Sequence, residues 1–274
     1  MKIGTCIPGN SFIPDRTEEE KKLKLLTLID GYNVSIENGF DFVESSIGFI
    51  NSLSDGELVQ AEKLVKDGKL RVEACNSFIP GELAVSGNIV DFLALEAHVE
   101  KAMNRMQILG GEIIVFGSGG ARKIKDNSTH EKAVKQITEF LIMCGKKGEK
   151  YGITVVVEPL CLAECNIINS VAEGAEYVKA VSHPNIRLLA DCYHMHKDNE
   201  PMQNITDFGE FLAHTHIAEP MKRNTPGCEG GEYIIEFINY LKKAGYNSRI
   251  SVECGYPNFI ADSRKAANFL KSVL

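Results

Sequence analysis

Short apolar runs alternate with longer amphipathic segments along the whole chain. The short runs are rich in β-branched residues and are bounded by glycine, proline or polar residues, as is typical of strands buried on both faces. We expect eight strands, at residues 2–7, 41–45, 70–75, 112–116, 153–158, 186–191, 213–217 and 249–253. We expect helices at about residues 17–38, 54–67, 89–109, 128–151, 170–181, 204–211, 231–244 and 260–274.

Strands that alternate with helices predict a parallel sheet. Eight such units in 274 residues predict one α/β domain, residues 1–274, folded as a (β/α)8 TIM barrel. The alternative is an open, doubly wound sheet, which normally carries a glycine fingerprint after its first strand. This chain has TCIPGNSF there instead. Capping boxes at Thr17 with Glu20 and at Ser54 with Glu57 mark two of the expected helix starts.

Polar residues stand at the ends of the last four expected strands. Glu158, Asp191 and Glu253 end three of them, and His216 lies in the fourth. The carboxyl ends of barrel strands meet on one side, where the long connections and the active sites lie. Each acid would be costly to bury alone, and a cation would compensate all of them together. The pattern therefore predicts a divalent-metal site.

Composition narrows the class of protein. The net charge is −7 and no basic block occurs, which argues against nucleic acid as the main partner. The N-terminus lacks an apolar signal-peptide core, and no stretch approaches the length of a membrane span. Eight irregularly spaced cysteines fit reduced thiols. We expect a cytoplasmic protein with no membrane partner.

The motifs around the strand ends resemble those of a known superfamily. The chain carries EPLCLAE from residue 158, DCYH from residue 191, HTHIAE from residue 214 and VECGY from residue 252. This set resembles the xylose isomerase-like TIM barrels, which include sugar phosphate isomerases and epimerases, D-tagatose and D-psicose 3-epimerases, hydroxypyruvate isomerases and inosose dehydratases. The resemblance covers essentially the whole chain, with the informative motifs in the second half.

The resemblance implies a role for each matching residue. Strand alternation leaves His214 and His216 equivalent, and the family pattern selects His216 as the metal-binding histidine. The implied metal ligands are Glu158, Asp191, His216 and Glu253. The implied substrate-binding residues are Glu164, His194 and Arg223. One divalent ion is expected, Mn²⁺, Mg²⁺ or Co²⁺ with Zn²⁺ as a further candidate, and no organic cofactor.

The implied chemistry is proton transfer beside a carbonyl. Glu158 and Glu253 would act as the catalytic pair, one removing a proton and the other returning it through a metal-stabilised enediolate. Return to the opposite face of the same carbon is epimerisation, and return to the neighbouring carbon is isomerisation. We predict a metal-dependent isomerase or epimerase of carbohydrate metabolism that acts on a ketose, a keto-sugar phosphate or a small hydroxy-keto acid.

Three other functions share this barrel. An inosose dehydratase-like lyase would use the same metal site and expel water. An endonuclease IV-like enzyme needs additional histidine ligands, but Asn76 and Phe116 stand at the corresponding strand ends. A non-catalytic sugar-binding barrel would not need the acids at positions 158 and 253. Assembly into a homo-oligomer through the outer helices is a further expectation.

Two features stay open at the level of sequence. The loop 117–123, GSGGARK, combines glycines with two cations and fits either an anion-binding nest or a flexible turn with solvated cations. The sequence therefore does not decide whether the substrate carries a phosphate. Glu44, near the end of the second expected strand, fits either a substrate contact or a structural hydrogen bond in the barrel mouth.

Overall fold

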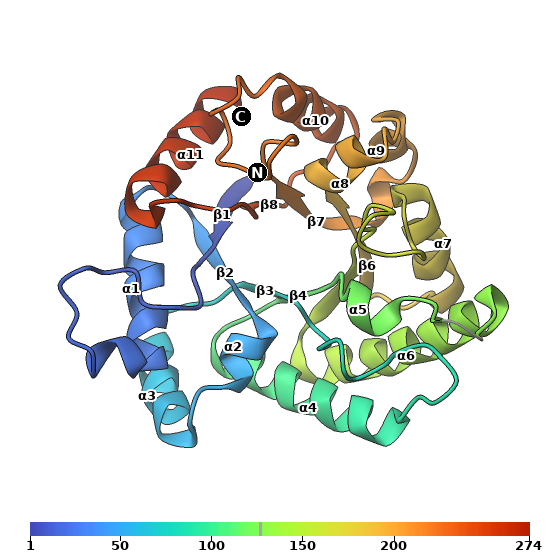
Figure 1. The fold of residues 1–274 in the computed structure, drawn as a ribbon, viewed down its shortest axis with the longest axis horizontal. Helices are drawn as coiled ribbons and strands as arrows, with labels where there is room; N and C mark the ends of the chain where they lie inside the picture. Colours follow the sequence, from blue (N-terminus) through green and yellow to red (C-terminus); the bar gives the residue numbers. More distant parts are fainter. Residues whose placement is uncertain (126–127) are drawn as a thin grey trace.

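The strands form one closed parallel barrel. In a computed structural model, which describes residues 1–125 and 128–274, each strand pairs with the next along the chain and the last pairs back with the first. The strands are β1 (Lys2–Cys6), β2 (Phe42–Ser46), β3 (Ala74–Asn76), β4 (Ile113–Phe116), β5 (Thr154–Val157), β6 (Ile186–Asp191), β7 (Leu212–Ile217) and β8 (Arg249–Val252). Figure 1 shows the strands enclosed by a ring of helices. The predicted TIM barrel is confirmed.

Helices fill the connections between the strands. The longer ones are α1 (Lys24–Glu37), α3 (Asp55–Lys66), α4 (Phe92–Ile108), α6 (His130–Tyr151), α7 (Val171–Val181), α10 (Glu232–Lys243) and α11 (Phe259–Val273). The shorter ones are η1 (Glu20–Lys22), α2 (Ile47–Asn51), α5 (Gly119–Arg122), α8 (Cys192–Lys197), α9 (Gln203–Asp207) and η2 (Gly209–Phe211). The described helices are all too short or too polar to cross a membrane.

The predicted helix 17–38 is wrong as a continuous element. Thr17 and Glu20 do exchange capping hydrogen bonds, but the helical turn that they begin is only the 3-10 turn η1. Leu23 then adopts an extended backbone, with φ −79° and ψ 105°, so α1 starts at the next residue. The capping box of Ser54 and Glu57 is complete and begins α3 as predicted.

Strand 70–75 was predicted too early in the chain. Leu70 and Val72 are buried, but β3 begins at Ala74, where pairing with Glu44 of β2 starts. An apolar run reports burial, and burial also occurs in the segment that approaches a strand. Of the short helices, α2, α5 and α8 were not predicted, because a helix of one turn shows no amphipathic period.

Buried side chains form two layers. The larger one lies between the strands and the helices, as in other barrels. The smaller one fills the barrel interior and consists of Phe42, Ala74, Ile113, Val115, Val156 and Leu189. Because alternate strand residues share a face, the polar residues Glu44 and Asp191, each two positions further along its strand, lie nearer the mouth. The barrel interior is therefore apolar at depth and polar at its mouth. All eight cysteines are free thiols.

Candidate metal centre and substrate pocket

The side chains predicted as metal ligands lie together at the barrel mouth. Glu158 directly follows β5, Asp191 ends β6, His216 lies in β7 and Glu253 directly follows β8. Each offers one ligand atom, and these four atoms all lie within 4.8 Å of one another. Four neighbouring parallel strands bring them together, because their carboxyl ends open onto the same side.

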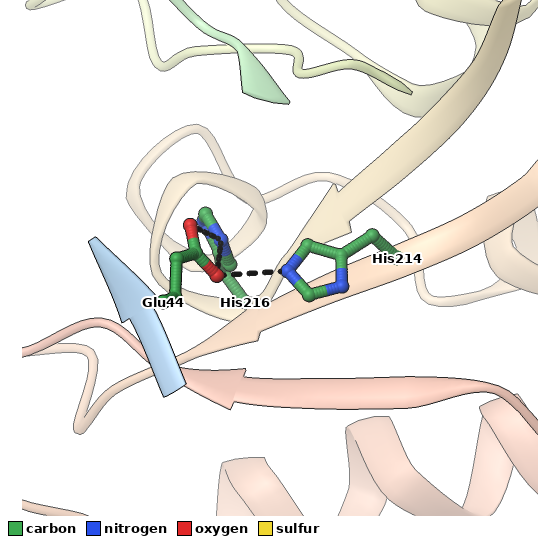
Figure 2. Close-up of side chains that lie close together, drawn as sticks. All are labelled: Glu44, His214 and His216. Atoms are coloured by element: carbon green, nitrogen blue, oxygen red, sulfur yellow. Dashed lines mark hydrogen bonds and ion pairs between the residues drawn. The ribbon is translucent and has the colours of Figure 1, made fainter. Parts of the chain in front are cut away.

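The two histidines of β7 have different neighbours. Both point to the barrel interior, as strand alternation requires. His216 joins the three acids, whereas His214 lies with its Nε2 2.9 Å from Glu44 Oε2 (Figure 2). Their different depths along the barrel axis give the two histidines these different neighbours, which alternation alone left open.

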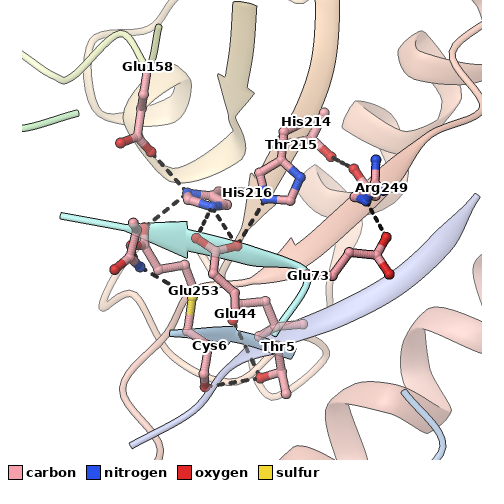
Figure 3. A network of polar contacts seen from close by, with 12 residues as sticks. Thr5, Cys6, Glu44, Glu73, Glu158, His214, Thr215, His216, Arg249 and Glu253 are labelled. Carbon is pink, nitrogen blue, oxygen red and sulfur yellow. Dashed lines mark hydrogen bonds and ion pairs between the residues drawn. The ribbon is translucent and has the colours of Figure 1, made fainter. Parts of the chain in front are cut away.

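His216 stands between two groups of carboxylates (Figure 3). Its Nδ1 is 3.0 Å from Glu158 Oε1 and 3.3 Å from Glu253 Oε2, and its Nε2 is 3.0 Å from Glu44 Oε1. The ring is fully buried. Burial lowers the pKa of His216, but Glu44 and Glu253 outweigh that effect and hold it well above the usual value.

Asp191 has a buried carboxylate oxygen that forms no hydrogen bond among the described residues. Its Oδ1 accepts a hydrogen bond from the backbone N–H of Tyr193 at 2.7 Å. Its Oδ2 is buried and has no hydrogen-bond partner among the described residues; His194 Nε2 and Arg223 Nη2 are each 3.7 Å away. An unpaired buried carboxylate oxygen is costly, and a cation would satisfy it. Three carboxylates and one imidazole therefore fit a divalent ion.

The two glutamates at the centre have opposite electrostatic surroundings. Burial is the main reason that the pKa of Glu158 is raised, with further contributions from the charges of Glu253 and Asp191. Burial also raises the pKa of Glu253, but His216 and Arg223 outweigh it and bring it to about 2. The two carboxyl groups thus differ in proton affinity although they flank one imidazole.

A cavity of about 520 Å³ opens over this centre. Its lining contains Glu158 and Glu253. It also contains the three residues predicted to bind substrate, Glu164, His194 and Arg223. Loops after β2, β3, β4 and β5 supply the remaining wall, so the structure brings the predicted residues into one pocket of a size that suits a small ligand.

Arg223 forms part of the pocket wall. Its guanidinium forms an ion pair with Glu253, lies 3.6 Å from Glu164 Oε1 and stacks 4.8 Å above the ring of Tyr193. Its backbone φ is 52°, a left-handed conformation that is uncommon outside glycine. These contacts hold the side chain over the pocket despite its loop position.

The tautomer of neutral His194 follows from its neighbours. The backbone N–H of Cys161 donates to His194 Nδ1 at 3.2 Å. A backbone N–H has no lone pair to offer, so Nδ1 is the acceptor and Nε2 carries the proton. The Nε2–H lies on the side of Asp191 and the pocket, where it can donate to a substrate oxygen.

Two residues near the centre were not assigned a role from sequence. Asn76, at the end of β3, donates from Nδ2 to Glu253 Oε1 at 2.8 Å and also lines the pocket. The search for polar residues at strand ends would have found Asn76 if amides had been included with acids and histidines. Glu44 is fully buried and hydrogen-bonded to two histidines. Of the two roles considered for it, the structural hydrogen bond is therefore the one observed, and the substrate contact is not.

The two cations of loop 117–123, whose role the sequence left open, do not line the pocket. Arg122 is fully buried, and its guanidinium donates to the carbonyl oxygens of Phe116 and Ile168. Ser118 Oγ accepts from the backbone N–H of Ile79. Lys123 is exposed. Arg122 therefore braces the backbone of the loop and does not face the pocket.

The comparisons with known proteins identify the family. Residues 34–273 match the family model described as xylose isomerase-like TIM barrel. The chain belongs to this family.

Curated relatives bear the names of epimerases and isomerases. The chain is 30% identical over 124 residues to a D-psicose 3-epimerase of Ruminiclostridium cellulolyticum, a match that covers 45% of this chain and 40% of that protein. It is 26% identical over 271 residues to a 3-dehydro-D-guloside 4-epimerase of Escherichia coli, with 92% and 94% covered. A crystal structure of a D-psicose 3-epimerase in the presence of D-fructose superposes with a TM-score of 0.82 at 20% identity, covering 100% of this chain and 99% of that one. This last similarity concerns the fold.

Proposed function

We propose that the protein is a divalent-metal-dependent sugar isomerase or epimerase that moves a proton at a carbon next to a carbonyl group. The observation that carries this proposal is the pair Glu158 and Glu253. They follow different strands, both contact Nδ1 of His216, and both line one pocket. The epimerases and isomerases among the relatives support the same class of reaction.

The ligand set that we propose consists of Glu158, Asp191, His216 and Glu253. A divalent cation held there would polarise the substrate carbonyl and make the neighbouring C–H bond more acidic. Oxygen ligands with one imidazole suit Mn²⁺, Mg²⁺ or Co²⁺, and can also bind Zn²⁺.

Glu158 and Glu253 perform the proton transfers in this proposal. The ionised carboxylate of one takes the proton from carbon and becomes a carboxylic acid. The carboxylic acid of the other returns a proton to the opposite face and becomes a carboxylate, so that the pair keeps one proton overall. The same pair serves isomerisation when the proton returns to the neighbouring carbon.

Three further residues hold the substrate. The Nε2–H of His194 and the guanidinium of Arg223 donate to substrate oxygens, and Glu164 accepts from a hydroxyl group. Among the described lining residues, Arg223 is the single lysine or arginine, and it is already paired with Glu253 and Glu164. A neutral ketose therefore fits this lining better than a sugar phosphate does.

Deuterium uptake followed by NMR tests the proposal. The protein is loaded with Mg²⁺ and incubated in D₂O with free ketoses, keto-sugars, their phosphates, hydroxypyruvate and inosose. We expect exchange of one carbon-bound proton, which depends on the metal and is lost with chelator. Mass spectrometry of the product separates isomerisation, which keeps the mass apart from the label, from loss of water by a lyase.

The labelled carbon names the reaction. Label at the carbon whose configuration inverts identifies an epimerase, and label at the neighbouring carbon identifies an isomerase. Absence of exchange with every compound of the panel, in protein shown to hold the metal, would contradict the proposed proton transfer. The Glu158→Gln variant serves as the matched negative control, because it keeps the size of the side chain and removes the base.

A further inference from the structure

Glu44 connects two strands that are not neighbours in the barrel. It belongs to β2, and both histidines that it contacts belong to β7, with β8 and β1 lying between these strands. Its carboxylate reaches across the interior, and Figure 2 shows its contacts with both imidazole rings. Glu44, His214 and His216 are all fully buried. A contact of this kind can fix the positions of side chains from both strands inside the barrel.

The contact determines which nitrogen of His216 keeps its proton when the ring is neutral, as a metal-binding histidine must be. Nε2 is 3.0 Å from Oε1 and 3.2 Å from Oε2 of Glu44. An ionised carboxylate only accepts hydrogen bonds, so Nε2 must be the donor. Nδ1 is the nitrogen that faces Glu158 and the other two acids. The ring is therefore oriented with the nitrogen that would bind a cation toward the proposed ligand set.

His214 in turn holds Glu44. Its Nε2 donates to Glu44 Oε2 at 2.9 Å. Its Nδ1 is buried without a hydrogen-bond partner in the described part of the chain, as suits a neutral ring with its proton on Nε2. The ring lies edge to face with His216, at 5.1 Å between centroids, and beside Phe42 at 6.2 Å. His214 can therefore fix the position of Glu44 without approaching the pocket.

We propose that Glu44 and His214 are positioning residues of the metal centre, which hold His216 in the Nε2–H tautomer and aim its Nδ1 at the cation. This inference rests on the proposed metal site. Carboxylate partners of metal-binding histidines act in this way in other proteins, where their loss typically lowers metal affinity or activity by about 10- to 100-fold.

Metal affinity is the decisive measurement. Binding of Co²⁺ to metal-free protein is measured by titration calorimetry for the wild type, Glu44→Gln and Glu44→Ala. An amide also carries an NH2 group that donates, so Nε2 of His216 can accept from it and the ring proton can move to Nδ1, which then has no lone pair for the cation. We expect about a tenfold weaker affinity for Glu44→Gln and about a hundredfold weaker affinity for Glu44→Ala.

A matched control separates positioning from general destabilisation. Glu73 is another buried carboxylate of the barrel, but it pairs with Arg249 and lies outside the candidate metal group. Glu73→Gln should lower thermal stability and leave the Co²⁺ affinity at the wild-type value. Equal affinities for the wild type and Glu44→Gln would overturn the positioning role alone. A wild-type protein that binds no Co²⁺ would overturn the proposed metal site and this inference together.

Two further measurements cover a Glu44 variant that does not fold. His214→Leu removes one hydrogen-bond donor to Glu44 and leaves an apolar side chain beside Phe42. We expect about a tenfold loss of Co²⁺ affinity for this variant as well. In the Co²⁺-loaded wild type, the Nε2–H of His216 should give a shifted, solvent-exchangeable proton signal, and the signal should exchange faster in His214→Leu. An unchanged signal with unchanged affinity would overturn the role of His214.

Discussion

Gly117 lies directly beside the carboxylate of Glu158. A Cβ atom at position 117 would be 2.1 Å from Glu158 Oε2, far inside the contact distance of real atoms. Gly117 follows β4, and its backbone φ is not in the left-handed region that favours glycine. The requirement for glycine here is therefore one of space, and the space is taken by an atom of the proposed catalytic pair.

Gly117→Ala should disable the centre with little effect on stability. The new methyl group would push the end of the Glu158 side chain out of place, because that end is more flexible than the backbone. We expect weaker metal binding and a large fall in kcat, with the free energy of unfolding nearly unchanged. Gly48→Ala is the matched control, since Gly48 lines the same pocket but a Cβ there meets nothing within 4 Å. Equal activity of both variants would show that Glu158 tolerates displacement.

Replacing either member of the catalytic pair by glutamine should abolish turnover. Glu158→Gln and Glu253→Gln keep the shape of the side chain but remove the group that accepts or donates the proton. General acid–base groups typically contribute about 10²- to 10⁴-fold to rate, and we expect losses of at least this order in kcat. Circular dichroism should confirm that both variants fold. Full activity in either one would refute the two-carboxylate mechanism.

Removal of the metal should lower thermal stability through the unpaired oxygen of Asp191. A cation that binds only the folded state stabilises it by about 2.7 kcal/mol at a hundredfold excess over Kd. We expect Tm to rise when Mn²⁺ is added to chelator-treated wild-type protein. Asp191→Asn is nearly the same size, and its Tm should respond much less to Mn²⁺. The same rise in both proteins would mean that the ion binds elsewhere.

The pair of Glu73 and Arg249 should make stability depend on pH. Burial raises the pKa of Glu73, but Arg249 outweighs it and the net shift is downward. A carboxyl group whose pKa is lower in the folded state stabilises the fold above its unfolded-state pKa. That stability is lost as the pH falls through the folded-state pKa.

Glu73→Gln tests this dependence. At about pH 7 we expect the free energy of unfolding of the variant to be about 2 kcal/mol lower than that of the wild type, because a charged hydrogen bond is lost. The difference should shrink as the pH falls below about 4.5, where Glu73 takes up a proton in the unfolded chain, and should vanish once the folded chain is protonated as well. Urea unfolding at several pH values measures both. A difference that stays constant with pH would assign the effect to packing.

Local patterns were sufficient for the architecture and for the parts of the site that lie at strand ends. The period of apolar residues distinguishes strands from helices, and the order of strands and helices leads to the barrel. Glu158, Asp191 and Glu253 were recognisable because a charged residue at the end of a buried strand needs a partner. Helix breaks such as that at Leu23 were not recognisable, because the residues on either side have ordinary helical composition.

Tertiary structure decided which residues meet across the barrel. His214 and His216 share one face of β7, so the local pattern treats them alike, and only their depth in the closed barrel gives one to Glu44 alone and the other to the acids as well. Arg122 is next to a glycine-rich stretch, yet the fold buries it against backbone carbonyls. The physical reason is common to both cases. Periodicity within one strand or loop sets the direction of a side chain, whereas its partners come from distant segments that are brought near only when the barrel closes.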